Sequence, residues 1–177
     1  MLFWHIGGTI ALIRYAFRDE RMDLRFLVLG AVVADLIDTP LGLIGYETLG
    51  AVRLGAHSLL VASSVMVVVV ALTRRGRPRR RWMALAVGML AHLVLDAMWA
   101  DQETLLWPFL GWEFTPAGPA DAGGYLRDVV TDPVMWAGEL FGLAYLVWLW
   151  RRAGLGSASA RAGFWSTGTI DVPIRRN

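Results

Sequence analysis

The stretch AHSLLVASSVMVVVVALT, residues 56–73, is followed at once by RRGRPRRR, residues 74–81. The first part approaches the ~20 mostly apolar residues that an α-helix needs to cross a hydrocarbon core. The second part contains six arginines and no acidic residue, and loops rich in Arg stay on the cytoplasmic side of a membrane. These two segments therefore predict a transmembrane helix that ends at the cytoplasmic face.

The composition of the whole chain agrees with a membrane protein. Of its 177 residues, 56% are hydrophobic and 18% are charged, whereas soluble domains average about 45–50% and about 25%. This hydrophobicity excludes intrinsic disorder for most of the chain, and the lack of cysteine excludes disulfides, cysteine-based metal sites and thiol nucleophiles. All 17 basic residues are arginines that gather between apolar runs, so we favour membrane topology over nucleic-acid binding.

Five apolar segments predict an all-α fold, a polytopic transmembrane helical bundle of about five spans. They cover residues 2–17, 26–44, 56–73, 82–100 and 133–150. We expect the protein in the plasma (inner) membrane, and its basic loops predict that the N-terminus lies outside and the C-terminus in the cytoplasm. We expect a transmembrane domain at 1–150, a long outer loop at 101–132 with little regular structure, and a disordered cytoplasmic tail at 151–177.

Charged and imidazole side chains within these segments are costly to bury in a membrane and are therefore functional candidates. At a rise of about 1.5 Å per residue, seven of them fall between the bilayer midplane and the outer surface. They are His5, Asp35, Asp38, His57, His92, Asp96 and Glu139. Such a layer predicts a site in the outer half of the membrane.

The spacing of these residues indicates a metal site. Asp35 and Asp38 are three residues apart, and His92 and Asp96 are four apart, so each pair lies on one helix face. Imidazole and carboxylate ligands fit Zn²⁺ best, with Mn²⁺ or Mg²⁺ as alternatives. Such an ion would also relieve the repulsion between clustered carboxylates and could activate a water molecule for hydrolysis. We therefore expect His5, Asp35, Asp38, His57, His92 and Asp96 as ligands.

Simpler interpretations stay open for several of these residues. His5 could bond only to helix backbone, and Asp38 could cap and break its helix before Pro40. Glu139 could be a ligand, a general base or an ion-pair partner of an arginine, and we take Glu139 and Asp38 as the catalytic candidates. Gly7, Gly8 and Gly88 are expected at close helix contacts.

The order of the motifs resembles a bacterial family, the membrane-bound metal-dependent hydrolases, also called LexA-binding, inner-membrane-associated hydrolases. The motifs that carry the resemblance are His5, Ala34-Asp35-Leu36-Ile37-Asp38, Gly55-Ala56-His57-Ser58-Leu59-Leu60, Gly88-Met89-Leu90-Ala91-His92-Leu93-Val94-Leu95-Asp96 and Leu105-Leu106-Trp107-Pro108. The chain departs from the family's Pro-Asp-x-Asp-His pattern, because its second aspartate, Asp38, is displaced by one position and no histidine follows it, and Val52 stands where the family often has a further histidine. The resemblance implies a hydrolase whose ligands include the matching His and Asp residues.

These observations together predict a membrane-embedded metal-dependent hydrolase, in which metal-bound water attacks a phosphoester, such as that of a lipid. Its partners would be the lipid bilayer and a lipid or other phosphoester substrate, with no nucleic acid. Two alternatives remain. One is a proton- or ion-coupled transporter with an Asp/His relay, and the other is a non-catalytic membrane scaffold derived from the hydrolase family.

Overall fold

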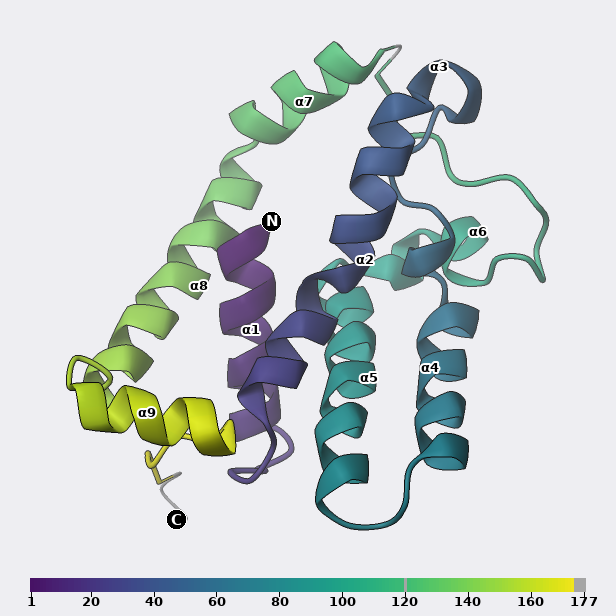
Figure 1. The fold of residues 1–177 in the computed structure, drawn as a ribbon. Coiled ribbons are helices and arrows are strands. Elements are labelled where there is room, and N and C mark those ends of the chain that lie inside the picture. Colours follow the sequence, from purple (N-terminus) through teal and green to yellow (C-terminus); the bar gives the residue numbers. More distant parts are fainter. Residues whose placement is uncertain (120, 174–177) are drawn as a thin grey trace.

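The computed structural model describes residues 1–119 and 121–173, and all the regular elements in these two ranges are helical (Figure 1). The α-helices are α1 Leu2–Tyr15, α2 Leu24–Ile44, α3 Tyr46–Leu49, α4 Leu59–Leu72, α5 Arg77–Leu95, α6 Gln102–Leu105, α7 Ala122–Thr131, α8 Pro133–Arg152 and α9 Ala158–Thr167. Two 3₁₀ turns, η1 Gly55–His57 and η2 Met98–Ala100, flank α4 and α5. The all-α prediction is confirmed for the residues described.

The centre of the fold is the contact between α2 and α5. A Cβ atom on Gly30 would lie 2.0 Å from the Leu85 carbonyl oxygen, and one on Gly88 would lie 2.3 Å from that of Leu27. The two backbones can approach this closely only because both positions lack a side chain. This contact fixes how α2 and α5 pass each other, and hence which of their side chains meet.

Helix α1 packs between this pair and α8 (Figure 1). Gly7 faces Gly142, where a Cβ on Gly7 would lie 2.5 Å from the Gly142 carbonyl oxygen. The close-contact prediction is therefore confirmed for Gly7 and Gly88, whereas Gly8 faces the flexible side chain of Leu95. Helix α4 packs on the other side of α5.

The prediction of five spans is not confirmed. Among the described residues, two helices are long and apolar enough to cross a membrane, Leu24–Ile44 and Pro133–Arg152. Helices α1 and α4 have 14 residues each, or about 21 Å at 1.5 Å per residue. Helix α5 has 19 residues, but its first turn contains the arginines of the basic segment. The segment predicted as a span at 82–100 is α-helical only as far as Leu95, where α5 ends.

Two segments expected to be irregular contain helices. Within the expected tail, α9 begins after Ser157, whose side chain accepts from the backbone N–H of Ala160, and ends at Gly168 in a left-handed conformation. Ser and Gly favour these two ends of a helix. The loop at 101–132 contains α6 and α7, each of which also begins with a side-chain cap, from Asp101 and Asp121. The remainder of the tail prediction, at 174–177, lies outside the described residues.

Candidate metal site

Four of the predicted ligands meet at one point in the structure. Asp35 comes from the middle of α2, His57 from η1, His92 from the last turn of α5, and Asp96 from the residue that caps α5. Each offers one nitrogen or oxygen atom, and these four atoms all lie within 4.8 Å of one another. Both histidines are fully buried, and the side chain of Asp35 is 31% exposed. The cluster therefore has a closed side and an open side.

The hydrogen bonds of the two imidazole rings determine which nitrogens are available. His57 Nδ1 lies 2.7 Å from Asp38 Oδ2, and His92 Nδ1 lies 2.7 Å from the Ala31 carbonyl oxygen. Both partners are oxygen acceptors, so each Nδ1 carries a proton, and in the neutral form of each ring the Nε2 atom presents its lone pair. The two Nε2 atoms face each other at 3.2 Å. Two lone pairs do not form a hydrogen bond, but they suit a shared cation.

Two carboxylate oxygens lie close to these two nitrogens, which makes four candidate ligand atoms. Asp35 Oδ1 lies 3.4 Å from His57 Nε2 and 3.8 Å from His92 Nε2. Asp96 Oδ2 lies 3.9 Å from each of these nitrogens. In a tetrahedral zinc site with bonds of about 2.0–2.1 Å, neighbouring ligand atoms are about 3.3 Å apart. The donor set fits a divalent ion once the two carboxylates move closer together, because the four atoms lie within 4.8 Å of one another rather than about 3.3 Å.

Asp38, a predicted ligand and catalytic candidate, has a different place. Its Oδ2 accepts hydrogen bonds from the backbone N–H groups of Leu54 and His57 as well as from the His57 ring, and its Oδ1 accepts from Ala56 N–H. Asp38 does not break α2: the helix continues through Pro40 to Ile44. Asp38 thus anchors η1 and orients the His57 ring, as carboxylates commonly do behind metal-bound histidines.

His5 supports the cluster from α1. Its Nε2 lies 2.8 Å from Asp96 Oδ1, and its Nδ1 contacts the carbonyl oxygen of Met1. Both ring nitrogens therefore already face oxygen atoms of the protein. The ring also stacks on His92, with centroids 4.2 Å apart. These contacts let His5 orient Asp96 and His92, and its role as a ligand stays a prediction.

Glu139 is not brought into the cluster. Its carboxylate accepts from the backbone N–H groups of Phe3 and Trp4, at 3.0 and 3.4 Å. These groups lie in the first turn of α1 and have no partner within that helix. Glu139 therefore joins α8 to the start of α1, next to the Gly7–Gly142 contact, and its contacts support a structural role.

Arg53 is a site residue that sequence reasoning missed. Its Nε lies 3.0 Å from Asp96 Oδ2, and its side chain is 39% exposed. Arg53, Asp96 and Thr115 line an open pocket of about 270 Å³ beside the cluster. The available signal was that Arg53 is the one arginine of the segment 45–55, close to His57 in sequence.

The local backbone explains why His57 and Asp96 lie where they do. Ser58 caps α4 by accepting from Val61 N–H and also bonds to the Gly55 carbonyl oxygen, so it holds the η1 turn that presents His57. After Asp96 the chain turns at Ala97, which has φ +53°. This left-handed conformation ends α5 and directs the chain away from the cluster.

An all-helical bundle with apolar helices and a buried His/Asp cluster defines a class of protein, a helical membrane protein with a candidate metal site. Comparison with protein families is more specific. A family model described as "YdjM inner membrane protein" matches residues 2–162, so the chain belongs to the YdjM inner membrane protein family. No curated protein and no solved structure matches the chain.

Proposed function

We propose that this protein is a membrane-embedded, metal-dependent phosphoesterase. One observation carries the proposal: the Nε2 atoms of His57 and His92 lie 3.2 Å apart, each on a ring whose Nδ1 is bound to an acceptor. Two carboxylates lie beside them. Imidazole nitrogens and carboxylates that meet this closely need protons or a cation between them, and a divalent ion would neutralise the group.

The residues that would hold the ion are His57, His92, Asp35 and Asp96. This mixture of imidazole and carboxylate favours Zn²⁺, with Mn²⁺ or Mg²⁺ as alternatives. When bound, such an ion supplies Lewis acidity, which polarises a phosphoryl oxygen and lowers the pKa of water. Asp38 and His5 keep the ligands in place, since their contacts fix the His57 ring and the Asp96 carboxylate.

Arg53 indicates the substrate class. Its guanidinium group lies at the edge of the cluster and is partly exposed in the adjoining pocket. A planar guanidinium is suited to hydrogen-bond a phosphate and to balance its charge during hydrolysis. A phosphoester whose phosphate contacts Arg53 would present its phosphorus to the open side of the cluster. A lipid phosphoester is the favoured source, because the site lies among apolar helices.

The proposed topology extends the two long apolar helices to five spans, with α1, α4 and α5 as shorter crossings. Large apolar side chains are exposed on the outer faces of these helices, as on Val67, Val68 and Leu72 of α4. Such surfaces are typical of contact with lipid. The arginines at the start of α5 favour a cytoplasmic position for that end, which places the His/Asp cluster toward the outer leaflet, with the N-terminus outside.

Elemental analysis and a turnover assay on the full chain test this proposal. The protein is purified in detergent, and its metal content and hydrolysis of bis(p-nitrophenyl) phosphate are measured. We expect His57→Ala and His92→Ala to lose bound metal and at least ~100-fold of the activity. Arg53→Gln should keep the metal, raise KM and lower kcat/KM about tenfold.

Asp128→Asn provides the matched control, because Asp128 is an exposed carboxylate on α7, outside the cluster. It should retain both metal and activity. Retention of stoichiometric metal in both histidine variants would remove the metal site from the proposal. A wild-type protein that binds metal but hydrolyses neither the model diester nor phospholipids would contradict the enzymatic function.

A further inference from the structure

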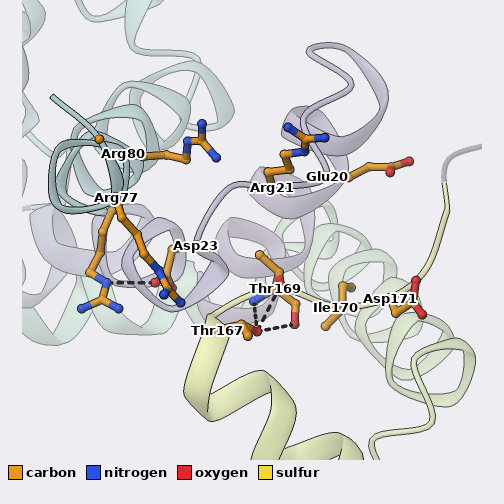
Figure 2. Close-up of a pocket in the computed structure, with 11 residues that line it drawn as sticks. Glu20, Arg21, Asp23, Arg77, Arg80, Thr167, Thr169, Ile170 and Asp171 are labelled. Atoms are coloured by element: carbon orange, nitrogen blue, oxygen red, sulfur yellow. Dashed lines mark hydrogen bonds and ion pairs between the residues drawn. The ribbon is translucent and has the colours of Figure 1, made fainter.

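A second concave site lies at the opposite end of α5 from the His/Asp cluster. It is an open pocket of about 640 Å³, formed between the loop before α2, the first turns of α5 and the segment that follows α9 (Figure 2). Four arginines line it: Arg21, Arg77, Arg80 and Arg81. None of these residues takes part in the proposed hydrolysis, so the pocket needs an explanation of its own.

The arginines of this pocket fall into two groups. Arg81 is engaged, because its Nε lies 3.2 Å from Asp23 Oδ2. For the guanidinium groups of Arg21, Arg77 and Arg80, no hydrogen bond or ion pair with another described residue is seen. Figure 2 shows Arg80 and Arg21 on opposite sides of the pocket, with the Arg80 guanidinium extending toward Arg21. Arg21, Arg77 and Arg80 therefore bring three charged donors to the lining of one open pocket, and none of their guanidinium groups has a described acceptor.

The acidic residues of the pocket bind other arginines or lie apart from Arg77 and Arg80. Asp23 is buried and already binds Arg25 and Arg81, at 2.7 and 3.2 Å. Its side chain also caps α2. Figure 2 shows the carboxylates of Glu20 and Asp171 on the side of the pocket away from Arg77 and Arg80. The side formed by α5 therefore keeps a positive potential, to which the N-terminal end of the helix adds.

We propose that this pocket binds a phosphate group, carried either by the headgroup of an anionic phospholipid or by free phosphate. Guanidinium groups form paired hydrogen bonds with phosphate oxygens and hold them better than they hold monovalent anions. Two or three arginines from separate segments can surround one phosphate. Basic pockets between helices near the cytoplasmic surface are also where membrane proteins bind anionic headgroups.

Positive charge keeps a loop on the cytoplasmic side of a membrane, whatever the arrangement of the arginines within that loop. The same basic segment contains a matched comparison for this reason. Arg74 and Arg75 are exposed and do not line the pocket, whereas Arg77 and Arg80 do. Arg77→Gln/Arg80→Gln and Arg74→Gln/Arg75→Gln therefore remove the same charge from the same segment, and only the first pair of substitutions changes the pocket.

The test measures ligand binding to the full-length protein in neutral detergent. Native mass spectrometry follows binding of phosphatidylglycerol, with phosphatidylcholine as the zwitterionic reference, and calorimetry follows inorganic phosphate. We expect phosphatidylglycerol to bind more tightly than phosphatidylcholine. Arg77→Gln/Arg80→Gln should weaken this binding about tenfold, and Arg74→Gln/Arg75→Gln should change it less than twofold. Arg21→Gln, on the other wall, should weaken it several-fold.

Each outcome has a stated meaning. Selective loss of phosphatidylglycerol binding supports a lipid headgroup, and selective loss of inorganic phosphate binding without lipid preference supports free phosphate. Equal losses in the two double variants, or no binding of either ligand by the wild type, would overturn the proposal. Unchanged metal content in the double variants shows that they are folded, and it keeps this test separate from that of the hydrolase site.

Discussion

The two ends of α5 differ in whether their charged side chains are buried or exposed. At its C-terminal end, His92 is buried and the Asp96 side chain is only 3% exposed, and most polar atoms around them contact another polar atom. At its N-terminal end, Arg77 and Arg80 are open to solvent and have no described partner. Burial forces polar groups to satisfy one another and so defines a rigid geometry. Exposure leaves charge available for a ligand from outside.

The substitution Gly30→Val should have the largest effect, because it disturbs the α2–α5 contact that joins both ends. A Cβ atom there would lie 2.0 Å from the Leu85 carbonyl oxygen, so the helices must separate at a cost of about 3 kcal/mol or more. We expect a large fall in melting temperature together with loss of bound metal. Gly163→Val in α9, where no atom lies within 4 Å, should have little effect on either. A variant at Gly30 that melts like the wild type would refute the close contact.

Asp38→Asn should disturb the His/Asp cluster at the C-terminal end of α5 and leave the arginine pocket at the other end unchanged. The amide group would replace one oxygen by a donor, although the surrounding groups are three backbone N–H groups and an imidazole N–H. We expect a loss of about 1–3 kcal/mol in unfolding free energy and metal affinity lower by about 10–100-fold. Competition with a chelator measures the affinity. Unchanged affinity would mean that η1 does not depend on this carboxylate.

Asp23→Asn should weaken the start of α2 and its link to the N-terminal end of α5, by about 1 kcal/mol in unfolding free energy. Burial alone would raise the pKa of Asp23, but the hydrogen bonds and positive charges of Arg25 and Arg81 outweigh it and hold the pKa below its ordinary value. The stabilisation is therefore complete above about pH 4 and is lost as the pH falls through the lowered pKa. Melting temperatures between about pH 3 and pH 6 should fall less steeply in the variant than in the wild type. Equal slopes would contradict the ion pair.

The smallest effect is expected for Ala97→Gly, next to Asp96. Alanine at φ +53° carries a steric cost of about 1–2 kcal/mol that glycine does not. The greater freedom of glycine in the unfolded chain offsets about 0.5–1 kcal/mol of the gain. We expect a slight rise in melting temperature with unchanged metal content, whereas Ala137→Gly within α8 should lower it. A lower melting temperature in both the Ala97→Gly and the Ala137→Gly variants would show that Ala97 is not strained.

Much of the fold was predictable from hydrophobic runs, and the reason is visible in α2 and α8. Both are long and uninterrupted, so their bounds nearly match the predicted segments. The end of the 82–100 segment was wrong because Asp96 and Ala97 end α5, a local backbone effect that hydropathy does not report. Helix α9 was missed because it is mildly polar and depends on its caps, Ser157 and Gly168.

The residues that belong to the site were more predictable than the role that each of them has. Spacing along α2 and α5 correctly indicated that Asp35, His92 and Asp96 share a region. The separation of ligand candidates from supporting residues depends on which ring nitrogen meets an acceptor, as with His5 and Asp96 Oδ1. Such contacts join residues far apart in the sequence, and no local pattern encodes them. The same reason explains why Arg53 was missed.

The order of the donors along the chain has a consequence for biogenesis. Asp35, His57, His92 and Asp96 all precede α6, so a ribosome has finished the complete donor set before it begins α8. The arginine pocket instead requires Thr169 and its neighbours, which are translated much later. Binding of a cation at the proposed site and completion of the basic pocket would therefore be separable events, and the donor set for the first is complete while the rest of the chain is still being made.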